Sequence, residues 1–293
     1  MSAGVRVRGL LKSFGDQQVL KGIDLDIAPG EVVGLIGPNG AGKTTLMSCL
    51  LGFLHPNAGE ITIDGAPNDD LDVRRRTGFV PERMNFDRRE TGRNFLRYMA
   101  RLAEVKDAKT KVDAIMERLD IANAAHKRLS QYSRGMLQRV GMCQALIHEP
   151  AYLFLDEPTS GLDPNGVLLV RDLIAAQKQR GAAVLLNSHQ LAEVGKICDR
   201  VFFLSGGVIA REETLRHVDR ILVAITMLAG TYDAAAVERV ANAAPRENHV
   251  VIATVETEND IAEIVRELAA TGAGIIDVRR HTADLEGIFR GEA

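Results

Sequence analysis

The chain has 293 residues, of which 46% are apolar and 26% charged, and its formal net charge is −3. This composition is typical of an ordinary soluble globular protein with one large domain, or with one domain and an appendage. Acidic and basic residues are mixed along the chain, which excludes bulk electrostatic binding to nucleic acid. No apolar run approaches the roughly 18 residues of a membrane span. The N-terminus lacks a signal-peptide pattern, so we expect a cytoplasmic chain.

The first 215 residues alternate between strand and helix patterns, with a helical block in the middle. Apolar runs predict early strands at 5–11, 23–27, 32–36 and 59–63. From about residue 85 to 148, apolar residues three and four positions apart predict helices and almost no strand. The alternation then returns, with strands at 152–155, 183–186 and 201–204 and a helix at 166–180. We therefore expect an α/β fold with an inserted helical block.

The remaining residues, 216–293, have a separate βαβαβ pattern. Strands are predicted at 220–225, 250–255 and 274–278, and helices at 234–243 and 261–268. The segment contains no glycine-rich loop and no cluster of reactive residues. We expect a small C-terminal α/β domain with its own core, which serves as a dimerising or regulatory module. One route to dimerisation is pairing of the strand at 223–228 with a second copy.

A glycine-rich segment follows the predicted strand at 32–36 and precedes a predicted helix. It consists of Gly37, Pro38, Asn39, Gly40, Ala41, Gly42, Lys43 and Thr44, and it fits the pattern Gly-x-x-x-x-Gly-Lys-Ser/Thr. Glycines let backbone N–H groups converge on phosphate oxygens, and the helix N-terminus and Lys43 add positive charge. The Thr44 hydroxyl suits the Mg²⁺ that accompanies a nucleoside triphosphate. The segment, together with the adjacent Thr45, predicts a nucleotide site.

Two other segments carry residues suited to phosphate chemistry. An apolar strand ends at Asp156 and Glu157, at the sheet edge where α/β proteins bind ligands. We expect Asp156 to hold magnesium through its water shell, and Glu157 to orient and deprotonate the attacking water. Ser133 and Gly135 lie where a helix begins. They are suited to a second phosphate site, although serine at this position is also an ordinary helix cap.

These segments resemble, in order, the motifs of the ATP-binding subunit of ATP-binding cassette (ABC) transporters. Tyr132-Ser133-Arg134-Gly135-Met136 resembles the family signature Leu-Ser-Gly-Gly-Gln, and Ser160-Gly161-Leu162-Asp163 resembles the loop after the catalytic glutamate. The resemblance covers about the first 215 residues. It implies the P-loop NTPase cassette fold, in which a RecA-like core carries an antiparallel β subdomain and an inserted helical subdomain.

The resemblance also implies roles for single residues. Phe14 corresponds to the aromatic residue that stacks on adenine, Asp163 belongs to the nucleotide-binding set, and His189 corresponds to the switch histidine that senses the γ-phosphate.

The chain departs from the family pattern at two positions. Glu82 stands where the family has a magnesium-contacting glutamine, so it either contacts the metal directly or stays back through water. Arg134 replaces the first glycine of the signature, and it either assists γ-phosphate binding or faces solvent.

The implied mechanism needs two chains and a membrane partner. ATP held by Lys43 and Thr44 of one copy would be covered by Ser133 and Gly135 of a second, so a homodimer is expected. Transport would need a separate integral-membrane permease, which would hold the chain on the inner face of the membrane. Glu82, the altered signature, the extra C-terminal domain and the closing segment 284–289 resemble ATPases of ABC-2-type exporters. The alternatives are a soluble ABC protein acting on ribosomes or DNA, and an unrelated P-loop kinase.

Overall fold

The computed structural model describes residues 4–189, 191–215, 221–245, 248–255 and 257–280. The chain forms two compact units, residues 1–215 (unit 1) and 216–293 (unit 2). The closing segment 284–289 lies outside the described residues. Among the described residues, no helix has both the length and the apolar character needed to cross a bilayer.

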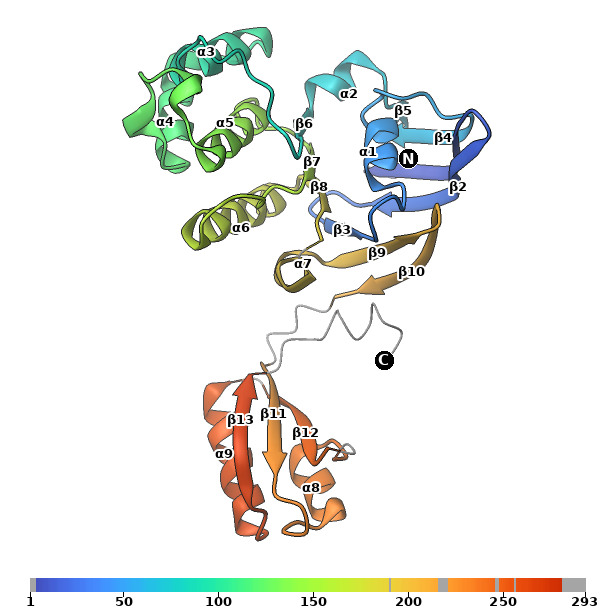
Figure 1. The fold of residues 1–293 in the computed structure, drawn as a ribbon, viewed down its shortest axis with the longest axis vertical. Helices are drawn as coiled ribbons and strands as arrows, with labels where there is room; N and C mark the ends of the chain where they lie inside the picture. The colour runs from blue at the N-terminus through green and yellow to red at the C-terminus, as the bar shows by residue number, and fades with distance from the viewer. Residues whose placement is uncertain (1–3, 190, 216–220, 246–247, 256, 281–293) are drawn as a thin grey trace. The chain divides into compact units, whose positions relative to one another are not determined.

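Unit 1 is organised around a six-stranded sheet with the strand order β10-β9-β3-β8-β7-β6 (Figure 1). Its strands are β3 (Val32–Ile36), β6 (Thr77–Val80), β7 (Tyr152–Asp156), β8 (Ala183–Asn187), β9 (Arg200–Ser205) and β10 (Val208–Thr214). All neighbouring pairs are parallel except β9 and β10. Every residue of β3, β7 and β8 is buried, which explains why these strands are continuous apolar runs in the sequence.

The helices that follow these strands place the ends of β3, β7 and β8 at one edge of the sheet. These helices are α1 (Lys43–Leu50), α6 (Pro164–Gln179) and α7 (Leu191–Ile197). Because parallel strands share their direction, the glycine-rich loop, Asp156 and Asn187 all lie at the carboxyl ends of adjacent strands.

An antiparallel sheet with the order β2-β1-β4-β5 packs beside the parallel sheet. Its strands are β1 (Val5–Phe14), β2 (Gln17–Ile27), β4 (Ala58–Ile63) and β5 (Ala66–Pro67). The two sheets and α1 share one core, in which Val7 and Leu25 of the antiparallel sheet join Leu35, Leu46 and Phe154.

The helical block lies on the opposite side of unit 1 from the antiparallel sheet (Figure 1). A short helix α2 (Leu71–Arg75) precedes β6, and the block itself contains α3 (Gly92–Leu102), α4 (Ala108–Arg118), α5 (Arg134–Leu146) and two short 3₁₀ turns, Ala122–Ala124 and Leu129–Gln131. Thr91 and Ser133 cap α3 and α5 by accepting the N–H groups of Asn94 and Met136. The observed helices agree with the helical block predicted for residues 85–148.

Tyr132 connects the start of α5 to the rest of the helical block through a hydrogen bond. Its buried hydroxyl donates to the Ala124 carbonyl oxygen at 2.7 Å, and burial raises the pKa of the phenol. We predict that Tyr132→Phe lowers the free energy of unfolding by about 1 kcal/mol, because the Ala124 carbonyl loses the hydroxyl donor and keeps the Lys127 N–H. Denaturant unfolding measures this change. The exposed Tyr98 is the matched control, and an equal loss in Tyr98→Phe would contradict the assignment.

The described residues of unit 2 form a three-stranded antiparallel sheet with two helices. Its elements are β11 (Ile221–Met227), α8 (Ala234–Ala241), β12 (Val250–Val255), α9 (Glu258–Ala270) and β13 (Ile275–Arg280). Its own core includes Val223, Val251, Val237 and Leu268. β11 is the central strand, hydrogen-bonded to β12 on one side and β13 on the other. The predicted pairing of the strand at 223–228 with a second copy is therefore wrong, because neither edge of that strand is available.

Candidate nucleotide site

The glycine-rich loop joins β3 to α1, and its backbone shape requires glycine. Gly40 and Gly42 have φ values of 80° and 109°, in the region that favours glycine. A Cβ atom on Gly37 would lie 2.2 Å from the Leu204 carbonyl oxygen. Gly42 directly precedes the first turn of α1, so the loop ends at a helix N-terminus, which attracts anions.

Lys43 lies against the loop that it follows. Its ammonium donates to the carbonyl oxygens of Gly37 at 2.6 Å and Pro38 at 3.0 Å. Burial lowers the pKa of Lys43, while the carboxylates of Glu157 and Asp156 oppose that shift. The side-chain nitrogen of Lys43 is therefore held at the glycine-rich loop, bonded to two of its carbonyl oxygens.

A cavity of about 350 Å³ opens at this edge of the sheet. It brings together predicted residues from three segments that are distant in the sequence, the glycine-rich loop with Thr45, Glu82, and Asp156 with Glu157. Its lining residues are Gln17, Val19, Asn39, Gly40, Gly42, Lys43, Thr44, Thr45, Glu82, Asp156, Glu157 and Asn187. Gln17 and Val19 on β2 were not predicted, because no motif marks them and only the packing of the antiparallel sheet brings them here.

Asp156 is buried at the end of β7 and accepts a hydrogen bond from the Asn187 amide at 2.5 Å. The two residues are direct neighbours in the register of β7 and β8. Burial is the largest cause that raises the pKa of Asp156, and the nearby charges of Glu157 and Glu82 act in the same direction. The sequence contains Asn187 beside the predicted switch histidine, but its contact with Asp156 depends on the sheet register.

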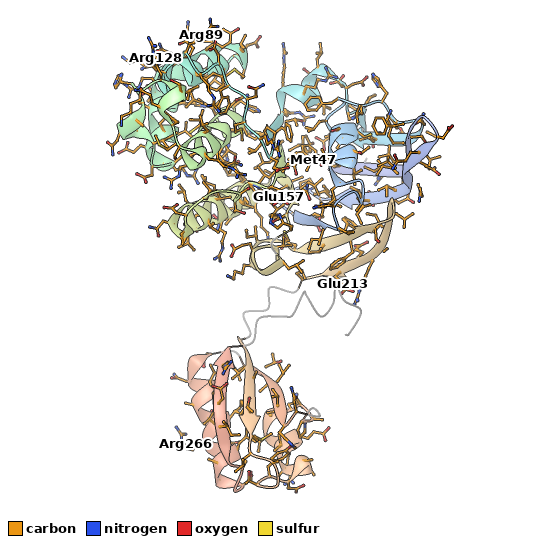
Figure 2. The ribbon with its side chains drawn as sticks, viewed as in Figure 1. Met47, Arg89, Arg128, Glu157, Glu213 and Arg266 are labelled. Carbon is orange, nitrogen blue, oxygen red and sulfur yellow. The ribbon has the colours of Figure 1, made fainter. Side chains whose placement is uncertain are left out.

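Glu157 and His189 form a close pair beside the cavity. His189 Nδ1 lies 2.8 Å from Glu157 Oε2, and the His189 backbone N–H donates to Glu157 Oε1 at 3.0 Å. Glu157 is 8% exposed and has a φ of 49°, an uncommon value for a residue with a side chain. Figure 2 labels Glu157 in the interior of unit 1. The two predicted catalytic residues are thus in direct contact, and the imidazole remains largely open to solvent, with 67% of the side chain exposed.

Eight predicted residues do not line the cavity: Gly37, Pro38 and Ala41 of the loop, His189, and the more distant Phe14, Ser133, Gly135 and Asp163. Phe14 is half exposed at the end of β1, with the Lys12 ammonium 5.2 Å from its ring centre. Ser133 and Gly135 lie at the N-terminus of α5, and Asp163 caps α6 by accepting the Gly166 N–H at 2.9 Å. The last three residues lie on elements other than the strands and loop that form the cavity.

The two departures from the family pattern have different surroundings. Glu82 is exposed and lies between the nucleotide cavity and an adjoining hollow of about 670 Å³. Arg134 donates to the Ser160 hydroxyl at 2.7 Å within the same chain. Arg134 is exposed, as the solvent-facing alternative expected, and its guanidinium also has the Ser160 hydroxyl as a partner.

Comparisons with known proteins agree with this geometry. A profile described as "ABC transporter" matches residues 20–160. The chain is 34% identical over 290 residues to the uncharacterized ABC transporter ATP-binding protein YdbJ of Bacillus subtilis (strain 168), covering 97% of this chain and 94% of that protein. It is 38% identical over 214 residues to the daunorubicin resistance ATP-binding protein DrrA3 of Streptomyces coeruleorubidus, covering 72% and 68%.

A solved structure supports the same conclusion. The dimeric structure of a bacterial ABC transporter cassette matches with a TM-score of 0.67 and 25% identity, covering 73% of this chain and all of that one. The predicted cassette fold is confirmed. The relatives named above are ABC transporter or drug-resistance ATP-binding proteins, so neither the ribosome or DNA alternative nor the kinase alternative is favoured. The chain belongs to the ABC transporter family, as an ATP-binding and ATP-hydrolysing subunit.

Proposed function

We propose that this chain binds MgATP in the cavity at the glycine-rich loop and hydrolyses it to drive export through a separate membrane permease. The observation that carries the proposal is the Glu157–His189 pair, held beside a phosphate loop that contains Lys43. Glu157 accepts a proton from the attacking water, and His189 holds that water against the γ-phosphate. Most of the catalysis comes from positioning and from the neutralisation of charge.

The nucleotide is held by backbone and side-chain groups of both copies in a dimer. The N–H groups of 37–42, the Lys43 ammonium and the hydroxyl groups of Thr44 and Thr45 hold the phosphates in one copy, and Phe14 stacks on the adenine. Ser133, Gly135 and Asp163 act from the second copy. The solvent-open position of the α5 N-terminus, away from the cavity of its own chain, supports this division. Binding of two ATP molecules therefore brings two chains together.

The cavity has the oxygen donors that Mg²⁺ prefers. The Thr44 hydroxyl and the Asp156 carboxylate line it together, and Glu82 lies at its border. Mg²⁺ in nucleotide sites is bound by one or two protein oxygens, phosphate oxygens and water, so this donor set fits. When bound, the ion neutralises charge on the phosphates. We assign Thr44 and Asp156 as the residues that hold it, with Glu82 acting through water.

We predict opposite effects of Asp156→Asn on turnover and on stability. Loss of the carboxylate lowers magnesium-dependent turnover by about 100-fold. This is the usual order of magnitude when an enzyme loses one electrostatic contact that stabilises the transition state. Folding raises the pKa of Asp156, so this group lowers stability at every pH above its folded pKa. At neutral pH without nucleotide, Asp156→Asn therefore melts at a higher temperature than the wild type. A phosphate-release assay with and without EDTA, and calorimetry, measure the two effects. An unchanged turnover would contradict the metal role.

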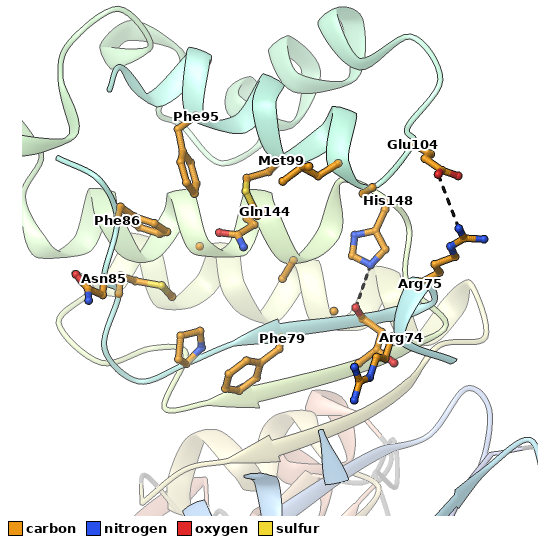
Figure 3. A pocket seen from close by; sticks show the side chains of 18 of the residues that line it. Arg74, Arg75, Phe79, Asn85, Phe86, Phe95, Met99, Glu104, Gln144 and His148 are labelled. Atoms are coloured by element: carbon orange, nitrogen blue, oxygen red, sulfur yellow. Dashed lines mark hydrogen bonds and ion pairs between the residues drawn. The ribbon is translucent and has the colours of Figure 1, made fainter. Parts of the chain in front are cut away.

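A large groove supports the proposed permease contact. A groove of about 800 Å³ lies between α2 and β6 on one side and α3 and α5 on the other (Figure 3). Phe79, Phe86, Phe95, Met99 and Leu102 supply apolar surface, and the Phe86 and Phe95 rings pack 4.9 Å apart. An apolar groove of this kind suits the apolar face of a helix. We infer that a cytoplasmic helix of the permease binds here and holds the chain on the inner face of the membrane.

The groove can be tested at Leu102, which lines it and is 61% exposed. We predict that Leu102→Glu weakens association with the permease by about tenfold, since an apolar contact is lost and a charge is buried. Turnover of the isolated chain stays unchanged. The assay is co-purification with a candidate permease that is co-expressed with this chain. Leu168→Glu on α6, exposed but outside the groove, is the control, and equal retention of both variants would argue against the groove.

We propose that unit 2 is a dimerising or regulatory module. Its separate core supports folding as an independent domain, and β12 and β13 lie at the edges of its sheet. Any sheet pairing between copies would therefore use β12 or β13.

A further inference from the structure

Arg134 occupies the junction between the start of α5 and the loop that follows Glu157. Its guanidinium donates to the Ser160 hydroxyl at 2.7 Å. Its side-chain carbons cover Gly161, where an added Cβ atom would lie 2.9 Å from Arg134 Cδ. Gly161 has a φ of 77°, a backbone conformation that favours glycine.

The next residue of α5 touches the same loop. A Cβ atom on Gly135 would lie 3.3 Å from the Gly161 carbonyl oxygen and 3.4 Å from Leu162 Cδ2. The start of α5 and the loop 160–162 thus meet at Arg134 and again at Gly135. The Arg134–Ser160 hydrogen bond and the close approach of Gly135 to Gly161 both join the N-terminus of α5 to this loop.

The loop is in turn tied to the proposed general base. The Ser160 N–H donates to the Glu157 carbonyl oxygen at 3.1 Å, which closes a turn between the two residues. Glu157 has an uncommon positive φ, and such conformations persist only where the surroundings hold them. A continuous set of contacts therefore runs from Arg134 through Ser160 to Glu157 and on to His189.

We propose that Arg134 is a positioning residue that couples the N-terminus of α5 to the loop 160–162, which follows Glu157 in the same chain. This inference rests on the function proposed above. In an ATP-bound pair, α5 contacts the nucleotide of the other copy, while Glu157 acts on the nucleotide of its own. Arg134 therefore links the two nucleotide sites of the pair. Nucleotide bound against α5 affects, through Arg134, how Glu157 is aligned with the nucleotide of its own chain. The arginine acts through Ser160 and does not touch the reacting atoms.

The test is a double-mutant cycle with Arg134→Ala, Ser160→Ala and the combined variant, assayed for ATP turnover as full-length chains. Each single change is expected to lower kcat about fivefold, on the order of one solvent-accessible hydrogen bond from a charged donor, with KM changed less than about twofold. The combined variant is expected to be no slower than the single ones, because both remove the same contact. Arg134→Lys, which keeps a charged donor, should recover part of kcat.

The control is Arg101→Ala, an exposed arginine of α3 whose side chain donates to the Arg97 carbonyl oxygen of its own helix. It is expected to match the wild type. The coupling role would be overturned if the losses in the combined variant were additive or if kcat were unchanged. It would also be overturned if the loss of kcat followed the folded fraction in thermal melts. If the Arg134 variants match the wild type while Glu157→Gln is inactive, only this inference fails. Turnover that persists in Glu157→Gln would instead count against the proposed function.

Discussion

Glu157→Gln is expected to bind ATP with near wild-type affinity and to hydrolyse it about 100- to 10,000-fold more slowly, the usual contribution of a general base. The amide keeps the shape of the side chain but cannot accept a proton at neutral pH. The buried position of Glu157, with His189 Nδ1 at 2.8 Å, makes this carboxylate the best-placed base at the cavity. Single-turnover hydrolysis and a direct ATP-binding titration separate the two quantities.

The same variant should accumulate as an ATP-bound dimer. If hydrolysis opens the pair, slow hydrolysis leaves it closed, and size-exclusion chromatography with MgATP will show a shift to twice the mass. Glu82→Gln is the matched control, since it removes a carboxylate at the border of the same cavity and is expected to retain most turnover. Wild-type turnover in Glu157→Gln would exclude it as the base.

Lys43→Ala is expected to weaken ATP binding by about 100-fold or more, because the loop loses its one full positive charge and a charge-assisted phosphate contact. The ammonium already lies at the loop, 2.6 Å from the Gly37 carbonyl oxygen, so binding needs only a short movement of the side chain. Fluorescence titration with a labelled nucleotide measures the affinity.

Two controls separate a binding defect from misfolding. Lys109→Ala removes an exposed ammonium on α4 and should bind ATP as the wild type does. The Lys43→Ala chain should keep its circular dichroism spectrum, since the glycine backbone and the core below it are unchanged. Equal affinities in the two lysine variants would refute the phosphate-loop role of Lys43.

Features set by neighbouring residues could be predicted from the sequence. The strand at 32–36, the glycine-rich loop and the helix after it were recognised because each depends on a short pattern and its flanks. The cap at Ser133 follows the same principle, since its hydroxyl bonds an N–H group three residues away. The Asp156–Glu157 pair was found because a buried strand leads straight to it.

Features that depend on contacts between distant segments could not be predicted from the sequence. β10 was not predicted, because an edge strand with mostly exposed, charged residues has no apolar alternation, and its pairing with β9 defines it. The central position of β11 was missed for a related reason. Strand order depends on how the helices pack and which edges they leave, and the apolar residues of β11 suit a central and an edge position equally well.

The properties of the nucleotide site also fall into these two groups, those set by local sequence and those set by contacts between distant segments. The sequence alone determined the ligand class and predicted which groups react, because phosphate recognition and proton transfer need particular side chains at short, fixed spacings. Only the tertiary structure decided that Asn187 bonds Asp156, that Gln17 and Val19 border the cavity, and that the exposed Arg134 side chain bonds Ser160. These contacts join residues from different elements, and their geometry follows from sheet register and helix packing, which no local pattern encodes.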